Sequence, residues 1–571
     1  MILFAIAFVL RALGVDYGYF HGDERINDAA KVLTGELAPG QHFYPPLINY
    51  VNAGAFVGLF ATGVGLGWWD SIGAFRAQYF IDPTVFYVTA RLVTAVFGAL
   101  LAPVCYWTAR RVGLSYRGAL VVGLLGALFP LGVYLSHIAK GDVAMATFTV
   151  AACAAAIARR DTMRPTRWDI LFGVMVVLAL SFKQSAVFIL APLAFGHIAL
   201  LANGEGGRAS GGAFLRGIVT VLIFWPILNI GTLLDFSTFL EYQHIQSVMS
   251  VRGVDQPLSG AQTLATRAPL LVLGLNPLLM VVTVILPVLV LLPICKLHHK
   301  GLLLVIWGAL MIGTLAVAFM AGPRQPEHLW IANFAGFALL ATLALVGLFE
   351  GSGGPSRSLA GLGLALTLAM SLWGAALPVG QALSEPIWKK TDALLRNQFF
   401  DARALTMVET AIPITREVQQ RQFARWDRLA AKYDVTMPDM APERIVEVSA
   451  PNSQFIMPMP SAMYGLEHVD EDAEGYEVQA HTWPLQPEEW QLDYWLDQDF
   501  EVFLVKDLDH QLNQSEAPLM RAFFAEVVDR CTLIETFDPN KPLYLERVVS
   551  VFQCSLPDKN TAPLAATATG E

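Results

Sequence analysis

The stretch FYVTARLVTAVFGALLAPVCYWTARR, residues 86–111, decides the fold class of this chain. It is a long apolar block that ends in two arginines, Arg110 and Arg111. A helix needs about 20 apolar residues to cross a bilayer, and the cytoplasmic ends of such helices are rich in Lys and Arg. The stretch therefore predicts a transmembrane helix that ends in the cytoplasm.

Similar apolar blocks recur along the chain as far as about residue 381. Apolar residues make up 55% of the sequence and charged residues 15%, whereas a soluble domain carries roughly 25% charged residues. The mean hydropathy is +0.49. These properties predict a polytopic α-helical membrane protein with about 11 transmembrane helices. The blocks lie near residues 2–13, 86–109, 118–135, 142–158, 168–182, 185–202, 214–234, 269–293, 301–320, 328–349 and 358–380.

The first block, residues 2–13, is short for a membrane span. A signal peptide would show a basic n-region and a small-x-small cleavage site, and the segment from Met1 to Val15 shows neither. We therefore expect a transmembrane helix that is cut short at its N-terminal end.

Residues 47–66 form an ambiguous block, apolar enough to cross but rich in Gly and containing Asn49 and Asn52. If this block does not cross, the basic loops all fall on one side, which the positive-inside rule makes the cytoplasm. If it crosses, those basic loops and the acidic first loop exchange sides, against the rule. We therefore expect one or two helices that lie in the outer interface. The basic loops carry Arg110, Arg111, Arg117, Arg159, Arg160, Arg164, Arg167, Arg208, Arg216, Lys296 and Lys300.

The composition changes near residue 381, where the apolar blocks end and an acidic, aromatic tail begins. We expect a membrane domain over residues 1–381, with a first outer loop at 14–85, and a soluble extracytoplasmic domain over 382–571. Strand patterns alternate with helical ones in this tail, which predicts a small α/β or α+β domain. The expected strands are 444–448, 501–505 and 543–549, and the expected helices are 402–433 and 515–530.

Four aromatic side chains of the tail could stack on sugar rings, although filling a small core is the commoner role for such residues. They are Trp483, Trp490, Tyr494 and Trp495. Cys531 and Cys554 could pair in an oxidising compartment. A hairpin turn near Asn540 would instead place Cys531 opposite Val549, so this pairing stays open.

The net charge of −10 and the lack of a Lys and Arg stripe exclude nucleic acid as an expected partner. Cys105, Cys153 and Cys295 lie in apolar blocks without zinc-type spacing, which indicates small buried hydrophobes.

The polar run HGDER, residues 21–25, follows the first apolar block. Carboxylates at the mouth of a membrane helix are costly to bury, so Asp23 and Glu24 either line an aqueous site or belong to a solvated loop. Farther along, Asp142 begins an apolar block, where a carboxylate can cap a helix. By the predicted topology all three carboxylates lie on the outer side.

Cationic residues fall on the same side of the membrane. Lys183 lies between two apolar blocks, where it either snorkels to the interface or faces the outer cavity as a phosphate ligand. Arg324 and His328 repeat the pattern two spans later, and the planar fork of an arginine can bond two phosphate oxygens. These groups together suggest a site for an anionic lipid head group.

The pattern resembles the polyprenyl-phosphate-dependent glycosyltransferases of the membrane-embedded GT-C fold, which include protein O-mannosyltransferases and lipid A aminoarabinose transferases. The resemblance covers most of the membrane domain. It is carried by Asp23-Glu24, Tyr44-Pro45-Pro46-Leu47 with Tyr50, Ala90-Arg91-Leu92, Ser136-His137 with Asp142, Lys183, and Arg324 to His328, and Asp401-Ala402-Arg403 with Ile412-Pro413 resembles the start of the family's outer domain.

The resemblance implies a sugar donor on a polyprenyl phosphate and an unidentified acceptor on the outer face of a bacterial inner membrane. Asp23 would match the general base that deprotonates the acceptor, so that a single displacement inverts the anomeric carbon. Asp142 would match the second acidic position of the family. Lys183 and Arg324, with His328, would hold the donor phosphate. The supporting residues would be Glu24, Arg25, His137, Lys140 and Tyr44.

The chain departs from the aminoarabinose branch, which has an acidic and a basic residue where this chain has Tyr44 and Pro45, and an arginine where it has Ile26. No cofactor is certain from the sequence. His21, Glu24 and His42 could form a divalent-cation site, or they could be ordinary hydrogen-bonded loop residues.

A transporter or flippase of lipid-linked sugars is the alternative function, because it would also need charges near the bilayer. Such a protein should show paired halves with interrupted helices near the midplane. The sequence shows no such symmetry, and its charges lie at helix ends. A scaffold whose tail recruits partners would leave the polar outer loops unexplained.

Overall fold

A computed structural model of the chain forms two compact units. One unit comprises Met1–Asp16, His21–Leu66 and Thr84–Leu383, and the other comprises Tyr17–Phe20, Gly67–Pro83 and Ser384–Glu571. The structure describes residues 1–17, 24–39, 42–81, 83–161, 165–205, 207–252, 276–320, 327–385, 387–398, 403–407, 490–497, 500–513, 518–538 and 548–556.

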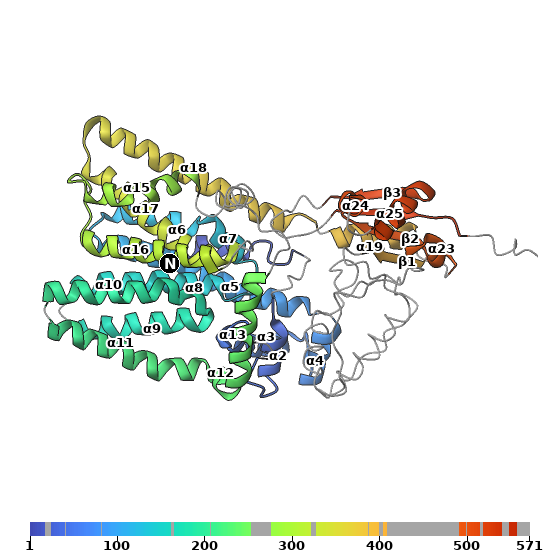
Figure 1. The fold of residues 1–571 in the computed structure, drawn as a ribbon, viewed down its shortest axis with the longest axis horizontal. Coiled ribbons are helices and arrows are strands. Elements are labelled where there is room, and N and C mark those ends of the chain that lie inside the picture. Colours follow the sequence, from blue (N-terminus) through green and yellow to red (C-terminus); the bar gives the residue numbers. More distant parts are fainter. Residues whose placement is uncertain are drawn as a thin grey trace, which may run out of the picture. The chain divides into compact units, whose positions relative to one another are not determined.

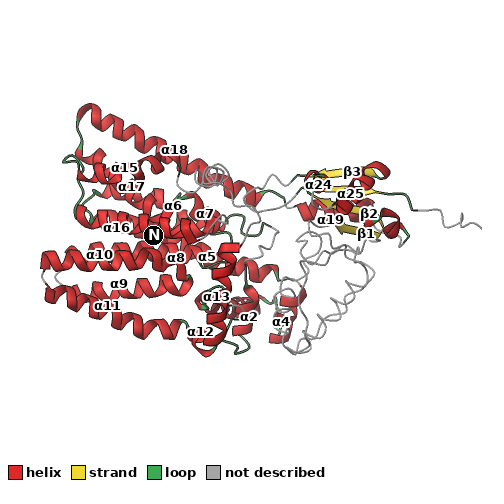
Figure 2. Ribbon diagram, viewed as in Figure 1, coloured by secondary structure: helices red, strands yellow, loops and turns green. Residues whose placement is uncertain are grey.

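The first unit, called here the membrane unit, is built of helices throughout its described residues (Figures 1 and 2). Its longer helices are α1 (Ile2–Ala12), α3 (Leu47–Leu66), α5 (Thr84–Arg111), α6 (Tyr116–Ala127), α8 (Asp142–Ala158), α9 (Pro165–Phe182), α10 (Val187–Glu205), α11 (Gly207–Leu228), α13 (Phe236–Arg252), α15 (Pro277–Leu291), α16 (Lys300–Met320), α17 (Ile331–Gly351) and α18 (Gly354–Leu383). The shorter ones are α2 (Ile26–Val32), α7 (Pro130–Leu135), α12 (Ile230–Leu234) and the 3-10 turns η1 (Arg159–Asp161), η2 (Gln184–Ala186) and η3 (Glu327–Trp330).

Among the described residues, eight helices are long and apolar enough to cross a membrane, and four shorter apolar helices accompany them. The predicted fold class, a polytopic helical membrane protein, is confirmed. Residues 47–66 form one continuous helix of 20 residues, which could cross by length and composition. That this helix lies in the interface stays a prediction.

Helices α8 and α17 form the centre of the membrane unit. In the most apolar stretch of α17, 94% of the residues are buried. This helix packs against α6, α8, α15, α16 and α18. Helix α8 packs against α5, α9 and α17. Because all its neighbours are helices, α17 can be apolar on every side.

The predicted span 118–135 is divided in two. Helix α6 ends at Ala127 and α7 starts at Pro130, since proline lacks the N–H of an interior helical residue. Arg11 is fully buried and donates to the carbonyl oxygens of Ala127 at 2.8 Å and of Ala7 at 3.0 Å. A cation therefore meets the negative end of the α6 dipole and links α1 to this break.

The second unit contains a four-stranded sheet in the order β1-β2-β4-β3. Strand β1 (Arg403–Met407) is parallel to β2 (Phe500–Lys506), while β4 (Val549–Gln553) is antiparallel to both β2 and β3 (Thr532–Phe537). The described helices of this unit are α4 (Ile72–Ile81), α19 (Ile387–Gln398), α23 (Leu492–Leu496), α24 (Leu508–Leu512) and α25 (Pro518–Arg530).

The sheet bears on several predictions about the tail. Strand β2 and helix α25 confirm the expected strand 501–505 and helix 515–530. The expected helix 402–433 is wrong at its start, because residues 403–407 pair with β2 as a strand. The expected strand 444–448 and most of 543–549 lie outside the described residues, and β3 had no counterpart in the predictions.

Two of the four aromatic residues considered in the tail, Trp490 and Trp495, pack in the core of the second unit, whereas Tyr494 is 36% exposed. Trp495 is fully buried with Phe503 and Phe523, and Trp490 packs against the same cluster. The core-filling interpretation is therefore confirmed for both tryptophans, whereas Trp483 falls outside the part of the chain that the structure describes.

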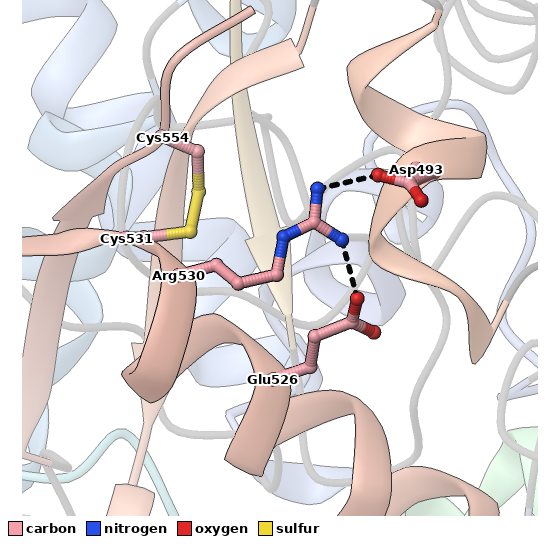
Figure 3. Close-up of a disulfide and its surroundings, with 5 residues drawn as sticks. All are labelled: Asp493, Glu526, Arg530, Cys531 and Cys554. Carbon is pink, nitrogen blue, oxygen red and sulfur yellow. Dashed lines mark hydrogen bonds and ion pairs between the residues drawn. A yellow bond between two sulfur atoms is a disulfide. The ribbon is translucent and has the colours of Figure 1, made fainter. Parts of the chain in front are cut away.

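Cys531 and Cys554 form a disulfide at the ends of β3 and β4 (Figure 3). The two strands pair Thr532 with Gln553 and Phe537 with Val549, so the cysteines flank the first pair. The register expected from a turn at Asn540 was wrong, because Val549 faces Phe537 and not Cys531.

Candidate functional site

Three of the predicted site residues, His21, Asp23 and Arg324, lie outside the described residues, and their roles stay predictions. The others belong to the membrane unit. Most of them gather around two places, the buried carboxylate of Glu24 and the N-terminal end of α8, while His42 contacts Asp235.

Glu24 forms a buried ion pair with Arg91 of α5. The Arg91 Nε donates to Glu24 Oε1 at 2.7 Å and its Nη2 donates to Oε2 at 2.6 Å, while its Nη1 reaches the carbonyl of Val15 at 2.8 Å. Glu24 also accepts a hydrogen bond from the backbone N–H of Ala139 at 2.8 Å. This carboxylate therefore fastens the start of α2 to α5 and to the turn before Asp142.

The turn at 136–141 is fixed by its own polar residues. Ser136 donates to the carbonyl of Gly132 at 2.5 Å. The two ring nitrogens of His137 lie 2.9 Å from the Val133 carbonyl and 2.8 Å from that of Leu13. Burial lowers the pKa of His137, and nearby Arg91 and Arg11 act in the same direction. The imidazole therefore positions the turn against α1.

Asp142 lies at the start of α8 between two ammonium groups. The Lys183 Nζ contacts its Oδ1 directly, and the Lys140 Nζ lies 3.8 Å from its Oδ2. Lys183 follows α9, with an extended backbone that ends the helix. Gly141 permits this meeting of α8 and α9, because a Cβ there would lie 2.6 Å from the Phe182 carbonyl oxygen.

Tyr44 completes this group of residues. Its ring lies 5.4 Å from the Lys140 Nζ, 5.5 Å from the Lys183 Nζ and 6.0 Å from the guanidinium carbon of Arg25. These distances suit cation–π interactions, which are stronger where the cation is shielded from water. We call Tyr44, Lys140, Asp142 and Lys183 the Tyr44 cluster.

The Tyr44 cluster has the chemistry of an anion site. Within these four residues, two ammonium groups and one carboxylate stand next to a phenol that can donate a hydrogen bond. Asp142 and both lysines are buried, which strengthens electrostatic interactions within the cluster. His328 of η3 lies near enough to act electrostatically on Asp142. The predicted residues Asp142, Lys183, Lys140, Tyr44 and His328 are thus neighbours.

The predicted cation-binding residues are engaged elsewhere where they are described. Both carboxylate oxygens of Glu24 bond Arg91, and the His42 Nε2 lies 2.8 Å from Asp235 Oδ2. In the described part of the chain, no group of three or more His, Cys, Asp and Glu side chains could hold a metal ion. His21 is not among these residues, so the divalent-cation site stays a prediction.

Two contacts of the site could not be read from the sequence. Arg91 was recognised only as part of a motif, and its partner lies 67 residues away. Asp235, the partner of His42, lies in a loop without a recognisable motif. Tyr44 could be singled out from the sequence only through the Tyr44-Pro45-Pro46 motif, which does not indicate its contacts with the two lysines.

Comparisons with known proteins agree with this architecture. The family model of dolichyl-phosphate-mannose-protein mannosyltransferases matches residues 40–208, the segment that contains the whole Tyr44 cluster. No curated protein matches the chain by sequence.

The fold is similar to that of ArnT from Cupriavidus metallidurans, solved with bound undecaprenyl phosphate. That match has a TM-score of 0.50 and 13% identity, and covers 96% of this chain and 97% of that one. The oligosaccharyltransferase of Archaeoglobus fulgidus matches with a TM-score of 0.45 and 13% identity, over 92% of this chain and 72% of that one. The resemblance to polyprenyl-phosphate-dependent GT-C glycosyltransferases is confirmed by the family model and the ArnT fold.

Proposed function

We propose that this protein transfers a sugar from a polyprenyl-phosphate donor to an acceptor on the outer face of a bacterial inner membrane. The observation that carries the proposal is the Tyr44 cluster, in which two buried ammonium groups and a buried carboxylate meet a phenol ring inside the segment that matches the mannosyltransferase family. A lipid phosphate is an anion that such a group would bind.

The proposed reaction is a single displacement. Asp23 takes the proton of the acceptor, the acceptor heteroatom bonds the anomeric carbon, and the bond from that carbon to the phosphate oxygen breaks. The polyprenyl phosphate leaves with the bonding electron pair. Lys183, with Arg324 and His328, stabilises the charge that grows on the phosphate oxygen.

Asp142 has a positioning role in this proposal. It contacts Lys183 directly and lies 3.8 Å from the Lys140 Nζ, so it holds the two ammonium groups together against their mutual repulsion. Glu24, the sequence neighbour of Asp23, is anchored by Arg91 and Ala139. This anchoring supports a precise geometry at the start of the first outer loop.

An extracytoplasmic tail is part of the same proposal. The disulfide between Cys531 and Cys554 supports it, since disulfides persist mainly in oxidising compartments. Both hexoses and pentoses are compatible with this chemistry.

Reconstitution in proteoliposomes tests the function. Radiolabelled polyprenyl-phosphate sugars with different head groups are supplied with extracted envelope lipids and peptides as acceptors, and both sugar transfer and leaflet exchange are followed. We expect transfer that Asp23→Asn lowers by about 100-fold or more. Leaflet exchange without transfer would instead establish a lipid-linked sugar transporter, and transfer unaffected by Asp23→Asn would remove the proposed base.

A further inference from the structure

His42 and Asp235 form a contact that the proposed reaction does not use. His42 is 1% exposed and lies in the loop before α3, while Asp235 lies between α12 and α13. Their side chains meet at 2.8 Å, across 193 residues of sequence. In Figure 1, α13 runs across the direction of α9, α10 and α11 at one end of the helices.

The three consecutive residues His42, Phe43 and Tyr44 face different partners. The ring centroid of His42 lies 6.1 Å from that of Phe239 in α13, and the ring of Phe43 packs at right angles to Tyr242 of the same helix, with 4.8 Å between the centroids. Tyr44, the next residue, faces Lys140 and Lys183. We call these three residues the 42–44 clip.

Two further features make the clip rigid. Pro45 and Pro46 follow Tyr44 and restrict the backbone between the clip and α3. The Tyr50 hydroxyl accepts from the backbone N–H of Gly231 and donates to the Leu37 carbonyl, each at 2.9 Å. Helix α12 is thus attached to the first outer loop beside the clip.

Asp235 is well suited to a fixed contact. It precedes the first residue of α13 and accepts hydrogen bonds from both the side chain and the backbone of Thr238, as an N-cap does. Burial acts to raise the pKa of Asp235, but the hydrogen bonds from Thr238 and His42 outweigh it and the pKa is lowered.

We propose that the His42–Asp235 contact is a positioning device, which holds the ring of Tyr44 against Lys140 and Lys183 so that the two ammonium groups bind the donor phosphate. The significance of the device for catalysis rests on the proposed function. The geometric part of the proposal is independent of the function, because it states only that the His42–Asp235 contact keeps Tyr44 over Lys140 and Lys183.

Lysine acetylation followed by mass spectrometry tests the geometric part on the full-length protein in nanodiscs. The variant His42→Phe keeps the aromatic packing and loses the hydrogen bond, and Asp235→Ser keeps an N-cap but is too short to reach His42. Because a typical hydrogen bond is worth about a tenfold change in a local equilibrium, we expect Lys140 and Lys183 to react about tenfold faster in both variants. Asp235→Asn keeps an acceptor oxygen and is expected to react like the wild type.

Internal and matched controls make the outcome decisive. Lys300, which bonds the Leu292 carbonyl, is the internal reference, and Asp493→Ser, which breaks the contact with Arg530, is the matched control. Faster reaction confined to the two lysines supports the device. Unchanged rates, or an equal rise at Lys300, would overturn it.

Binding of undecaprenyl phosphate to the same samples separates the device from the function. We expect His42→Phe and Asp235→Ser to weaken binding about tenfold while the melting temperature stays the same. If the wild type does not bind this lipid, the proposed function fails and the acetylation result still decides the device. If the variants bind as the wild type does, the device has no part in phosphate binding.

Discussion

Lys183 is the residue on which the proposed phosphate site depends most directly. Its ammonium contacts Asp142 and lies over the Tyr44 ring, and the side chain is buried. A hydrogen bond to a charged group is worth about 1.5–3 kcal/mol. We therefore expect Lys183→Met to weaken binding of undecaprenyl phosphate by roughly 10- to 100-fold in a direct binding assay.

The control for this substitution is Lys300→Met. Lys300, the first residue of α16, is also partly buried, but its ammonium bonds the Leu292 carbonyl at the end of α15. Wild-type affinity is expected for this variant. An equal loss of affinity in the two variants would mean that removing a lysine weakens binding by destabilising the fold as a whole.

Glu24 and Arg91 make a second prediction at the scale of residues. Removing one partner of a buried ion pair leaves an uncompensated charge, which typically costs about 3–5 kcal/mol. Glu24→Leu should therefore lower the melting temperature of the purified protein strongly, whereas Glu24→Leu combined with Arg91→Met should restore much of the loss. A double variant as unstable as the sum of the single ones would contradict the pairing.

The contact between α1, α5 and α7 depends on a glycine. A Cβ at Gly98 would lie 2.8 Å from the Arg11 Nε and still closer to Ser136 Oγ. Overpacking a core typically costs about 1–3 kcal/mol, so Gly98→Ala is expected to lower the melting temperature. Gly54→Ala in α3 is the matched control, because a Cβ there has no atom within 4 Å; it should leave stability unchanged or slightly raised.

The paired strands β3 and β4 depend on their disulfide. It joins residues separated by 23 positions, and closing a loop of this length contributes about 3 kcal/mol in the chain-entropy model. We expect Cys531→Ser with Cys554→Ser to make the tail unfold at a lower temperature and to be cut faster by protease. Dithiothreitol should reproduce the effect in the wild type, and Cys295→Ala should respond to the reductant as the wild type does.

The membrane topology is a property of the whole molecule, and α3 decides it. Glu36 and Asp70 are exposed and lie on either side of α3 in the sequence. If α3 lies in the outer interface, a membrane-impermeant maleimide should label Glu36→Cys and Asp70→Cys from the same face of intact cells. Labelling of the two variants from opposite faces would show that α3 crosses the membrane.

The orientation of the tail can be tested in the same cells. Asp497→Cys in the tail should react with the reagent from outside, and Ser356→Cys, in the first turn of α18 beside the predicted cytoplasmic connection 351–354, should not. Both positions are exposed. Reaction of Ser356→Cys alone would invert the proposed topology.

The sequence by itself determined the membrane fold class, the main helices and the polar residues that resemble those of the GT-C glycosyltransferases. These properties follow from apolar block lengths, loop charges and short motifs, which are local in the chain. The tertiary structure alone decided that Arg91 is the partner of Glu24, that Tyr44 lies against Lys140 and Lys183, and that β3 pairs with β4 so as to join Cys531 to Cys554. Such contacts join residues far apart in sequence, and packing selects among the many partners that local patterns permit.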